Sequence, residues 1–290
     1  MKILVSTDSS CLIDYELLKK LGISVFPLNV IVDGEEYLDG ITINQETLCS
    51  AMRDNKAIKT STPAYGTILE YFDNLFSQGY DHIVHFTISS KLSSMYSLFK
   101  TISEEEYKDK LTIIDSYSVS ALMLSHVLYM YDEINKGTNI EEILKEIEQR
   151  KKDYYIYFVP ENLNALKNGG RISPTIAAIA NTVGIKPLIV LEDGGLEKSK
   201  MIKNTKHALC DRFDEIVKEA PGELYDYTLV IFDCKQTTYD YIHEYMSNTL
   251  GDGKVLTGII PVNVCAHCGP GTVGLIVSKK INKKSIKDFM

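Results

Sequence analysis

The residues KILVSTDSS at positions 2–10 place a short apolar run directly before a cluster of hydroxyl side chains and one carboxylate. The run at 2–5 is predicted to form a strand, and apolar runs at 82–86 and 111–114 are likewise followed by polar residues. Amphipathic helical segments separate these runs, which is the pattern of a parallel sheet covered by helices. The N-terminal part of the chain is therefore predicted to be an α/β fold with a mostly parallel sheet.

A second series of strands and helices begins near residue 154, where Tyr155 opens another apolar run. No linker rich in glycine, serine or proline separates the two series, so the change of series sets the boundary. We expect two α/β domains, an N-terminal one over residues 1–152 and a C-terminal one over residues 153–290. Within them, we expect one strand over 25–32 that ends in an Asp33-Gly34 hairpin turn. We also expect a helix over 12–21 capped by Ser9 or Ser10.

The composition limits the classes of partner. The chain has 290 residues with 31 basic and 39 acidic side chains, a formal net charge of −8, which argues against nucleic acid as the main ligand. The longest apolar-leaning stretch, at 172–191, is interrupted by two prolines, an asparagine and a lysine, so no membrane insertion is expected. The N-terminus has too few apolar residues for a signal peptide, and a cytoplasmic protein is expected.

Motif searches give no catalytic or metal site. The Gly-Asp-Gly-Lys sequence at 251–254 lacks the first glycine and the final Ser or Thr of a phosphate-binding loop. Cys265 and Cys268 form a lone Cys-x-x-Cys pair without the second pair of ligands that a structural zinc site needs. All six cysteines are expected to be free thiols, as in a reducing cytosol.

Hydroxyl-rich segments follow several predicted strands, at 7–10, 60–63, 87–94 and 115–116. In open α/β sheets the crevice beyond the carboxyl ends of the strands is the usual ligand site. Hydroxyl groups and helix-start N–H groups there can hold an anion. For Ser9, Ser10 and Ser116, helix caps and turns are the favoured explanation. The segment 87–94 has five hydroxyls in eight residues, more than one helix cap needs.

Two further polar positions come from the second half of the chain. Arg171 follows the glycine pair Gly169-Gly170, and Gly169 is predicted to be the left-handed C-terminal cap of a helix that ends at residue 168. His267 precedes a Gly-Pro-Gly sequence and is predicted to lie in a loop. Arg171 can equally be a surface residue. A lone loop histidine such as His267 is more often structural than functional.

Six motifs in chain order resemble those of the DegV family, and together they run from the first predicted strand to the last. They are TDSS (7–10), TSTP (60–63), SSKLSSMY (89–96), GGRIS (169–173), IKP (185–187) and HCGPG (267–271). Two departures are visible. Thr62 stands where the family commonly has glutamine, and Ser94-Met95 replaces a usual Gly-Thr.

The resemblance implies two α/β domains with a fatty acid buried between them. It also implies a lipid-binding subunit, not an enzyme, that has no catalytic residue and no cofactor. A separate ATP-dependent fatty acid kinase subunit would phosphorylate the bound carboxylate to an acyl phosphate, feeding phospholipid synthesis. By resemblance, the carboxylate ligands are Thr60 and Ser93, and Arg171 and His267 lie near the head group or face the kinase. A bidentate arginine would occupy both carboxylate oxygens, one of which must attack the phosphate, so Arg171 is predicted not to be the primary ligand.

Other functions stay open on the residues alone. One is a small hydrolase or phosphotransferase that uses Asp8, Asp115 or His267 as acid or base in the same crevice. Another is a lipid transport or sensor module that releases its ligand without phosphorylation. For a fatty acid ligand, the apolar residues at 172–185 and at 65–76, in a helix predicted over 65–77, are expected to form the walls of the tunnel.

Overall fold

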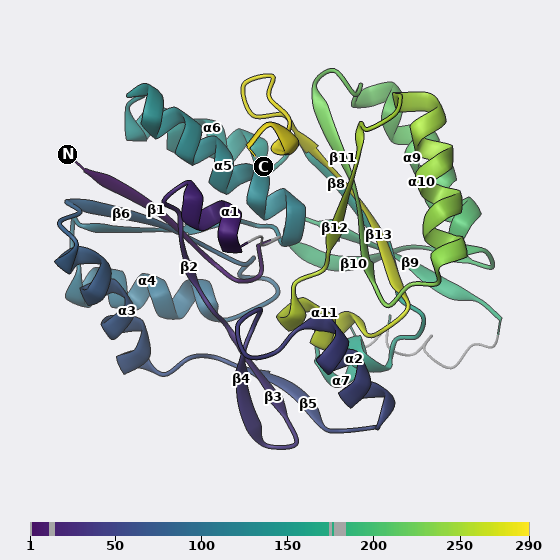
Figure 1. Cartoon of the computed structure of the whole chain (residues 1–290), viewed down its shortest axis with the longest axis horizontal. Helices are drawn as coiled ribbons and strands as arrows, with labels where there is room; N and C mark the ends of the chain where they lie inside the picture. Colours follow the sequence, from purple (N-terminus) through teal and green to yellow (C-terminus); the bar gives the residue numbers. More distant parts are fainter. Residues whose placement is uncertain (1, 12–14, 174–175, 177–183, 290) are drawn as a thin grey trace.

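The computed structural model of the chain describes residues 2–11, 15–173, 176 and 184–289. The first residues of the helix predicted over 12–21, and most of the apolar stretch at 172–185, lie outside the described residues. Within the described residues the chain forms three sheets surrounded by helices (Figure 1).

The first sheet has four parallel strands in the order β2-β1-β6-β7, which confirms the predicted parallel α/β sheet. The strands are β1 (Ile3–Asp8), β2 (Ser24–Phe26), β6 (His82–Thr87) and β7 (Leu111–Asp115). Strand β1 extends three residues beyond the predicted 2–5. Ser6 and Thr7 pair with both β2 and β6, and Asp8 still pairs with β2. The Ser6 hydroxyl is paired inside the protein, 2.8 Å from Nδ1 of His85, so this polar residue can be buried in a strand.

A small antiparallel sheet follows, in the order β4-β3-β5. Its strands are β3 (Asn29–Val32), β4 (Glu35–Leu38) and β5 (Ile58–Ser61). The predicted hairpin turn is confirmed, with positive φ angles at both Asp33 and Gly34. The single strand predicted over 25–32 is wrong. It is divided between β2 and β3 around Pro27, which has no N–H to donate to a strand ladder.

The largest sheet has six strands in the order β10-β9-β8-β13-β11-β12. Its neighbours pair antiparallel apart from β11 and β12, which are parallel. The strands are β8 (Tyr154–Val159), β9 (Lys186–Glu192), β10 (Gly195–Ile202), β11 (Tyr225–Phe232), β12 (Val255–Ile259) and β13 (Thr272–Lys279). All of them follow residue 152, and all strands of the four-stranded sheet precede it. The division into two domains at that residue stays a prediction.

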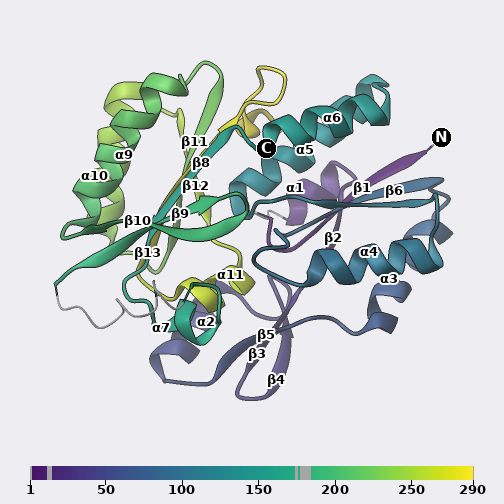
Figure 2. The ribbon, with the colours of Figure 1, turned by 180° about the vertical axis from the view of Figure 1, so that it is seen from behind.

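The longer helices cover the faces of the two large sheets (Figures 1 and 2). Helices α3 (Tyr65–Ser77) and α4 (Met95–Glu106) pack on one face of the four-stranded sheet, and α9 (Thr205–Glu219) and α10 (Gln236–Leu250) pack on the outer face of the six-stranded sheet. Helices α5 (Ser120–Lys136) and α6 (Ile140–Arg150) lie together, and α5 contacts both β1 and β13. The short helices are α1 (Tyr15–Lys20), α2 (Gln45–Arg53), α7 (Asn164–Asn168), α11 (Val262–Cys268) and the 3₁₀ helix η1 (Ile286–Phe289).

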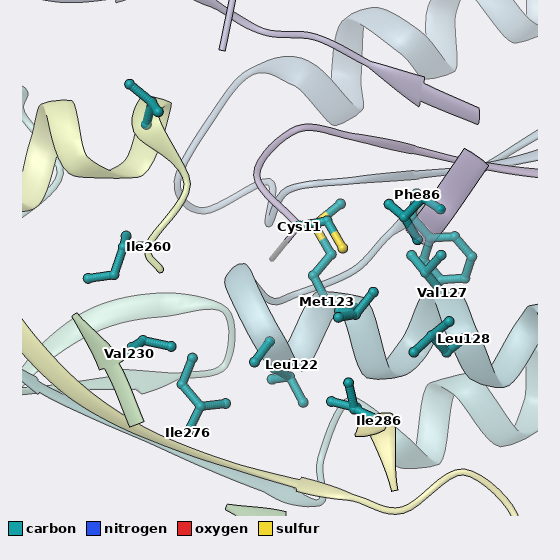
Figure 3. Packing of buried hydrophobic residues seen from close by; sticks show 14 of the residues in the cluster. Cys11, Phe86, Leu122, Met123, Val127, Leu128, Val230, Ile260, Ile276 and Ile286 are labelled. Carbon is teal, nitrogen blue, oxygen red and sulfur yellow. The ribbon is translucent and has the colours of Figure 1, made fainter. Parts of the chain in front are cut away.

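Helix α5 lies in an apolar core that the two halves of the chain share (Figure 3). Leu122 and Met123 on this helix belong to the same buried cluster as Phe86 from β6 and Ile276 from β13. Successive strand residues point to opposite faces, so the neighbour of Ile276, Leu275, is buried instead against α9 and α10. The inner faces of both sheets are therefore fixed relative to each other through α5.

Among the described residues, no helix is both long enough and apolar enough to cross a membrane.

Candidate functional site

A cavity of about 1150 Å³, measured out to its open mouth, lies where the two halves of the chain meet. Most of its wall is apolar, and the six-stranded sheet supplies part of it, including Ile156 and Phe158 from β8, Val230 from β11 and Ile276 from β13. Buried apolar surface of this kind favours a ligand with a long hydrocarbon portion.

The predicted tunnel walls are wrong where the structure describes them. No residue of α3 lines the cavity, because the apolar side chains of this helix, such as Ile68 and Phe72, are buried in the core beneath the four-stranded sheet. From the predicted stretch at 172–185, none of the described residues lines it either. Strands of the second half supply much of the apolar wall instead, together with residues of the first half such as Leu28, Ile88 and Met95.

All four residues singled out from the sequence line this one cavity: Thr60, Ser93, Arg171 and His267. They come from four separate elements, so only the tertiary fold brings them together. Which of them touches a ligand stays a prediction.

Hydroxyl groups from two segments gather at one part of the cavity. Thr60 lies on β5 and Thr62 just after it, while Ser93 and Ser94 lie in the turn before α4. The hydroxyls of Thr62 and Ser94 are 3.2 Å apart, which joins the two segments directly. Ser93 accepts a hydrogen bond from the Met95 N–H at 3.3 Å. Accepting that bond leaves the hydroxyl hydrogen of Ser93 able to donate to a ligand.

His267 is held beside this group of hydroxyls. It lies in the last turn of α11 and not in a loop, as the glycines after it suggested. Its Nε2 is 2.9 Å from Oγ1 of Thr60, while Nδ1 is buried without a hydrogen-bond partner among the described residues. Burial, together with the nearby positive charge of Arg171, lowers the pKa of His267 to about 4. The imidazole is therefore neutral at neutral pH.

Gly169 is needed because the ring of His267 lies against it. A Cβ on Gly169 would be 2.3 Å from Nδ1 of His267 and 3.1 Å from the carbonyl oxygen of Ala165. The predicted left-handed cap is wrong at this position, since Gly169 has a φ of −74° and the left-handed residue is Gly170, with a φ of +69°. The first glycine of the pair thus serves close packing and the second serves the turn.

Arg171 connects the glycine turn to the segment that carries Ser93. Its Nε donates to the carbonyl oxygen of Leu92 at 3.2 Å, and its Nη1 donates to the carbonyl oxygen of Gly169. Burial lowers the pKa of its guanidinium below the usual value. Arg171 therefore uses part of its donor set to join residues from the two halves of the chain.

Three buried polar residues also line the cavity: Ser10, Ser120 and Asn263. Nδ2 of Asn263 donates to the Ser10 hydroxyl at 2.7 Å, and the Ser120 N–H donates to the Ser10 carbonyl at 2.7 Å. From the sequence, Ser10 belongs to the hydroxyl-rich segment 7–10 and is also a candidate helix cap, whereas Ser120 and Asn263 are not predicted site residues. The signal for Asn263 was present, because it is an amide inside the otherwise mainly apolar run 259–266.

The carboxylates considered for an enzyme hold loops in place. Asp8 is buried and accepts hydrogen bonds from the N–H groups of Ile88 and Ser10 at 2.7 and 2.8 Å, and burial raises its pKa to about 6. Asp115 accepts from the N–H groups of Ser90 and Tyr117, both at 3.1 Å. Neither carboxylate lines the cavity.

Metal and thiol chemistry were also considered. The described residues contain no group of three or more histidine, cysteine or acidic side chains placed to hold a metal ion. Cys265 and Cys268 are buried, free thiols in α11.

Comparisons with a family model and with curated relatives both identify the DegV family. The family model described as "Uncharacterised protein, DegV family" matches residues 2–280. A DegV domain-containing protein from Clostridium acetobutylicum is 27% identical over 282 residues, which cover 96% of this chain and 99% of that protein.

Two solved structures share the fold. One describes fatty acid binding by a DegV family protein from Thermus thermophilus, with a TM-score of 0.87 and 24% identity, covering 96% of this chain and 100% of that one. The other is the fatty acid kinase B3 protein from Streptococcus pneumoniae, loaded with linoleic acid, with a TM-score of 0.80 and 19% identity, covering 96% of this chain and 99% of that one.

Proposed function

This chain belongs to the DegV family, and from that premise we propose that it binds a long-chain fatty acid in the cavity between its two halves. The observation that carries the proposal is the composition of the cavity: a mostly apolar wall from both halves of the chain, with the hydroxyls of Thr60 and Ser93 at one part of it. The fatty acids described for the relatives from Thermus thermophilus and Streptococcus pneumoniae support the same ligand class.

The hydrocarbon tail supplies most of the affinity. A fatty acid of about 16 carbons has about 14 methylenes, and their transfer from water contributes about 11 kcal/mol at about 0.8 kcal/mol each. Ordering the chain and losing free motion oppose this by several kcal/mol. The balance still favours tight binding, provided that the wall stays apolar along the chain.

The head group sets the orientation of the ligand. Hydroxyl donors from Thr60 and Ser93 hold the carboxylate, each bond to the charged group contributing about 1.5 to 3 kcal/mol. His267 is neutral and shares a hydrogen bond with Thr60, so it fixes the threonine rotamer without adding a full charge. The carboxylate therefore stays reactive.

A separate ATP-dependent kinase subunit then phosphorylates this carboxylate to an acyl phosphate, which feeds phospholipid synthesis. The fatty acid kinase B3 protein supports this step as a structural relative of the same fold. Our chain would act as the lipid-binding subunit, with Arg171 and His267 on the side that the kinase approaches.

The test starts with mass spectrometry of an organic extract of the purified protein, followed by acyl phosphate assays with ATP, with and without a fatty acid kinase. We expect a fatty acid in the extract and acyl phosphate only when the kinase is added. Ser93→Ala should retain less fatty acid, whereas Ser97→Ala, a matched change at an exposed serine of α4 outside the cavity, should retain the normal amount.

Other results would point to other functions. Fatty acid in the extract without acyl phosphate in the presence of kinase would indicate a transport or sensor protein. Turnover of a phosphate or acyl substrate by the chain alone would favour the hydrolase or phosphotransferase. An extract without lipid, and a protein that binds none when it is added, would contradict the proposal.

A further inference from the structure

Several polar side chains that line the cavity have hydrogen-bonding capacity that no described residue uses. One is Ser61, next to the proposed ligand Thr60, and two others lie on α5 and α11. Oδ1 of Asn263 and the hydroxyl oxygen of Ser120 are both buried without a hydrogen-bond partner among the described residues. Asn263 is 6% exposed and Ser120 is 3% exposed, and both line the cavity. A buried polar atom without a partner is costly, so it points to a polar group on the ligand.

These two residues are neighbours through Ser10. The side chain of Asn263 donates to the Ser10 hydroxyl, and the backbone of Ser120 donates to the Ser10 carbonyl, each at 2.7 Å. The unpaired amide oxygen on α11 and the unpaired hydroxyl on α5 therefore belong to two residues that both bond Ser10. A fatty acid with a plain hydrocarbon tail would leave both groups unpaired there.

The chemistry of the two groups selects a hydroxyl as their partner. Oδ1 of Asn263 can only accept a hydrogen bond, whereas the Ser120 hydroxyl can donate or accept. If the amide were turned over, with its oxygen toward Ser10, its NH₂ group would take the open position and could only donate. A ligand hydroxyl satisfies the amide in either orientation, because it both donates and accepts. A carboxylate cannot donate to the amide oxygen.

The position of Asn263 indicates where on the acyl chain this hydroxyl belongs. Asn263 and His267 are four residues apart on α11, so they lie on the same face of the helix, about one turn or 5.4 Å apart along its axis. His267 bonds Thr60, one of the proposed carboxylate ligands. The hydroxyl would therefore sit only a few carbons from the carboxyl group.

We infer that the cavity is built for a hydroxylated long-chain fatty acid, with a hydroxyl a few carbons from the carboxylate held by Asn263 and Ser120. This inference rests on the proposed function and narrows its ligand class. The hydroxylated acid should bind about five- to thirtyfold more tightly than its plain parent, as one to two net hydrogen bonds would give.

The experiment is a competition binding assay on the delipidated full chain, with palmitate, 3-hydroxypalmitate, stearate and 12-hydroxystearate as probes. Wild type should prefer 3-hydroxypalmitate over palmitate, and should show no such preference for 12-hydroxystearate over stearate, its parent of equal length. Asn263→Leu and Ser120→Ala should each reduce the ratio of 3-hydroxypalmitate to palmitate affinity at least about threefold. Ser118→Ala is the matched control, because it removes a buried, unpartnered hydroxyl two residues away that does not line the cavity.

The outcomes separate this inference from the proposed function. Palmitate binding with equal or weaker binding of 3-hydroxypalmitate would overturn the hydroxyl site and leave the fatty acid proposal intact. A preference for 12-hydroxystearate over stearate, or an equal loss of preference in Ser118→Ala, would also overturn it. Failure of wild type to bind any of the four acids would contradict the proposed function itself. Ser120→Ala keeps the test available if Asn263→Leu does not fold.

Discussion

Replacing Gly169 with alanine tests whether the glycine pair exists to seat His267. The new Cβ would lie 2.3 Å from Nδ1 of His267, whereas ordinary contacts begin near 3.4 Å. The imidazole would have to move by roughly 1 Å, since the other nearby atom is a backbone oxygen that cannot yield as easily. A shift of that size is incompatible with the 2.9 Å bond between His267 and Thr60.

The cost can be worked from these contacts. Overpacking of a buried site typically costs about 1 to 3 kcal/mol, and a lost hydrogen bond adds about 1 kcal/mol. We expect Gly169→Ala to lower the free energy of unfolding by about 2 to 4 kcal/mol, measured by urea denaturation at pH 7. Backbone strain contributes little, because the φ of −74° is open to alanine.

A double-mutant cycle identifies the cause. His267→Ala removes the clashing ring, so the cost of Gly169→Ala should fall by at least about 1 kcal/mol in that background. Gly170→Ala is the control: its Cβ would meet nothing within 4 Å, and its cost comes from the positive φ alone. That cost should be unchanged by His267→Ala. A Gly169→Ala variant as stable as wild type, or a cost unaffected by His267→Ala, would refute the reasoning.

Three further predictions concern the ligand and its head group. In isothermal titration, Ser93→Ala should weaken fatty acid binding about 10- to 150-fold and Arg171→Ala should weaken it less; the reverse order would mean that the arginine is the primary ligand. Octanoate should bind at least about a thousandfold more weakly than palmitate, because eight methylenes are worth about 6 kcal/mol, and near-equal affinities would contradict an apolar tunnel. In NMR titrations of ligand-free protein, His267 should stay neutral down to about pH 5, since its pKa is lowered to about 4, and a bound carboxylate should raise that pKa. Its contribution to stability should fall as pH drops from 6.5 toward 4, because the unfolded chain takes up the proton first; a ligand-free pKa near 6.5 would contradict the buried neutral ring.

The parts of the fold that could be predicted from the sequence are those with local causes. Helix α3 begins and ends at the predicted residues, because its apolar positions repeat at helical spacing. The β3–β4 hairpin follows from Asp33-Gly34, a pair that tolerates the positive φ of the turn. The parallel sheet follows from apolar runs separated by helical segments.

The parts that could not be predicted depend on pairing across the chain. Strand β5 has no apolar run of its own, and it is a strand because it pairs with β3. The Thr60–His267 bond joins residues 207 positions apart, which no local pattern reveals. The sequence predicts α3 as part of the tunnel wall. Its amphipathic pattern shows that one face of the helix is buried, but the pattern does not show whether that face lines the cavity or packs on the four-stranded sheet.

The hydrogen bonds of the Arg171 guanidinium explain how this cation can line the cavity without being the main ligand of the carboxylate. Two of its N–H groups are directed to carbonyl oxygens, at Leu92 and Gly169, and these bonds fix the distance between the glycine turn and the Ser93 turn. On the proposed function, one carboxylate oxygen must stay free to attack a phosphate, and hydroxyl donors leave it free more readily than a bidentate guanidinium does. Losing the arginine would therefore act first through the position of Ser93, and only then through the charge at the head group.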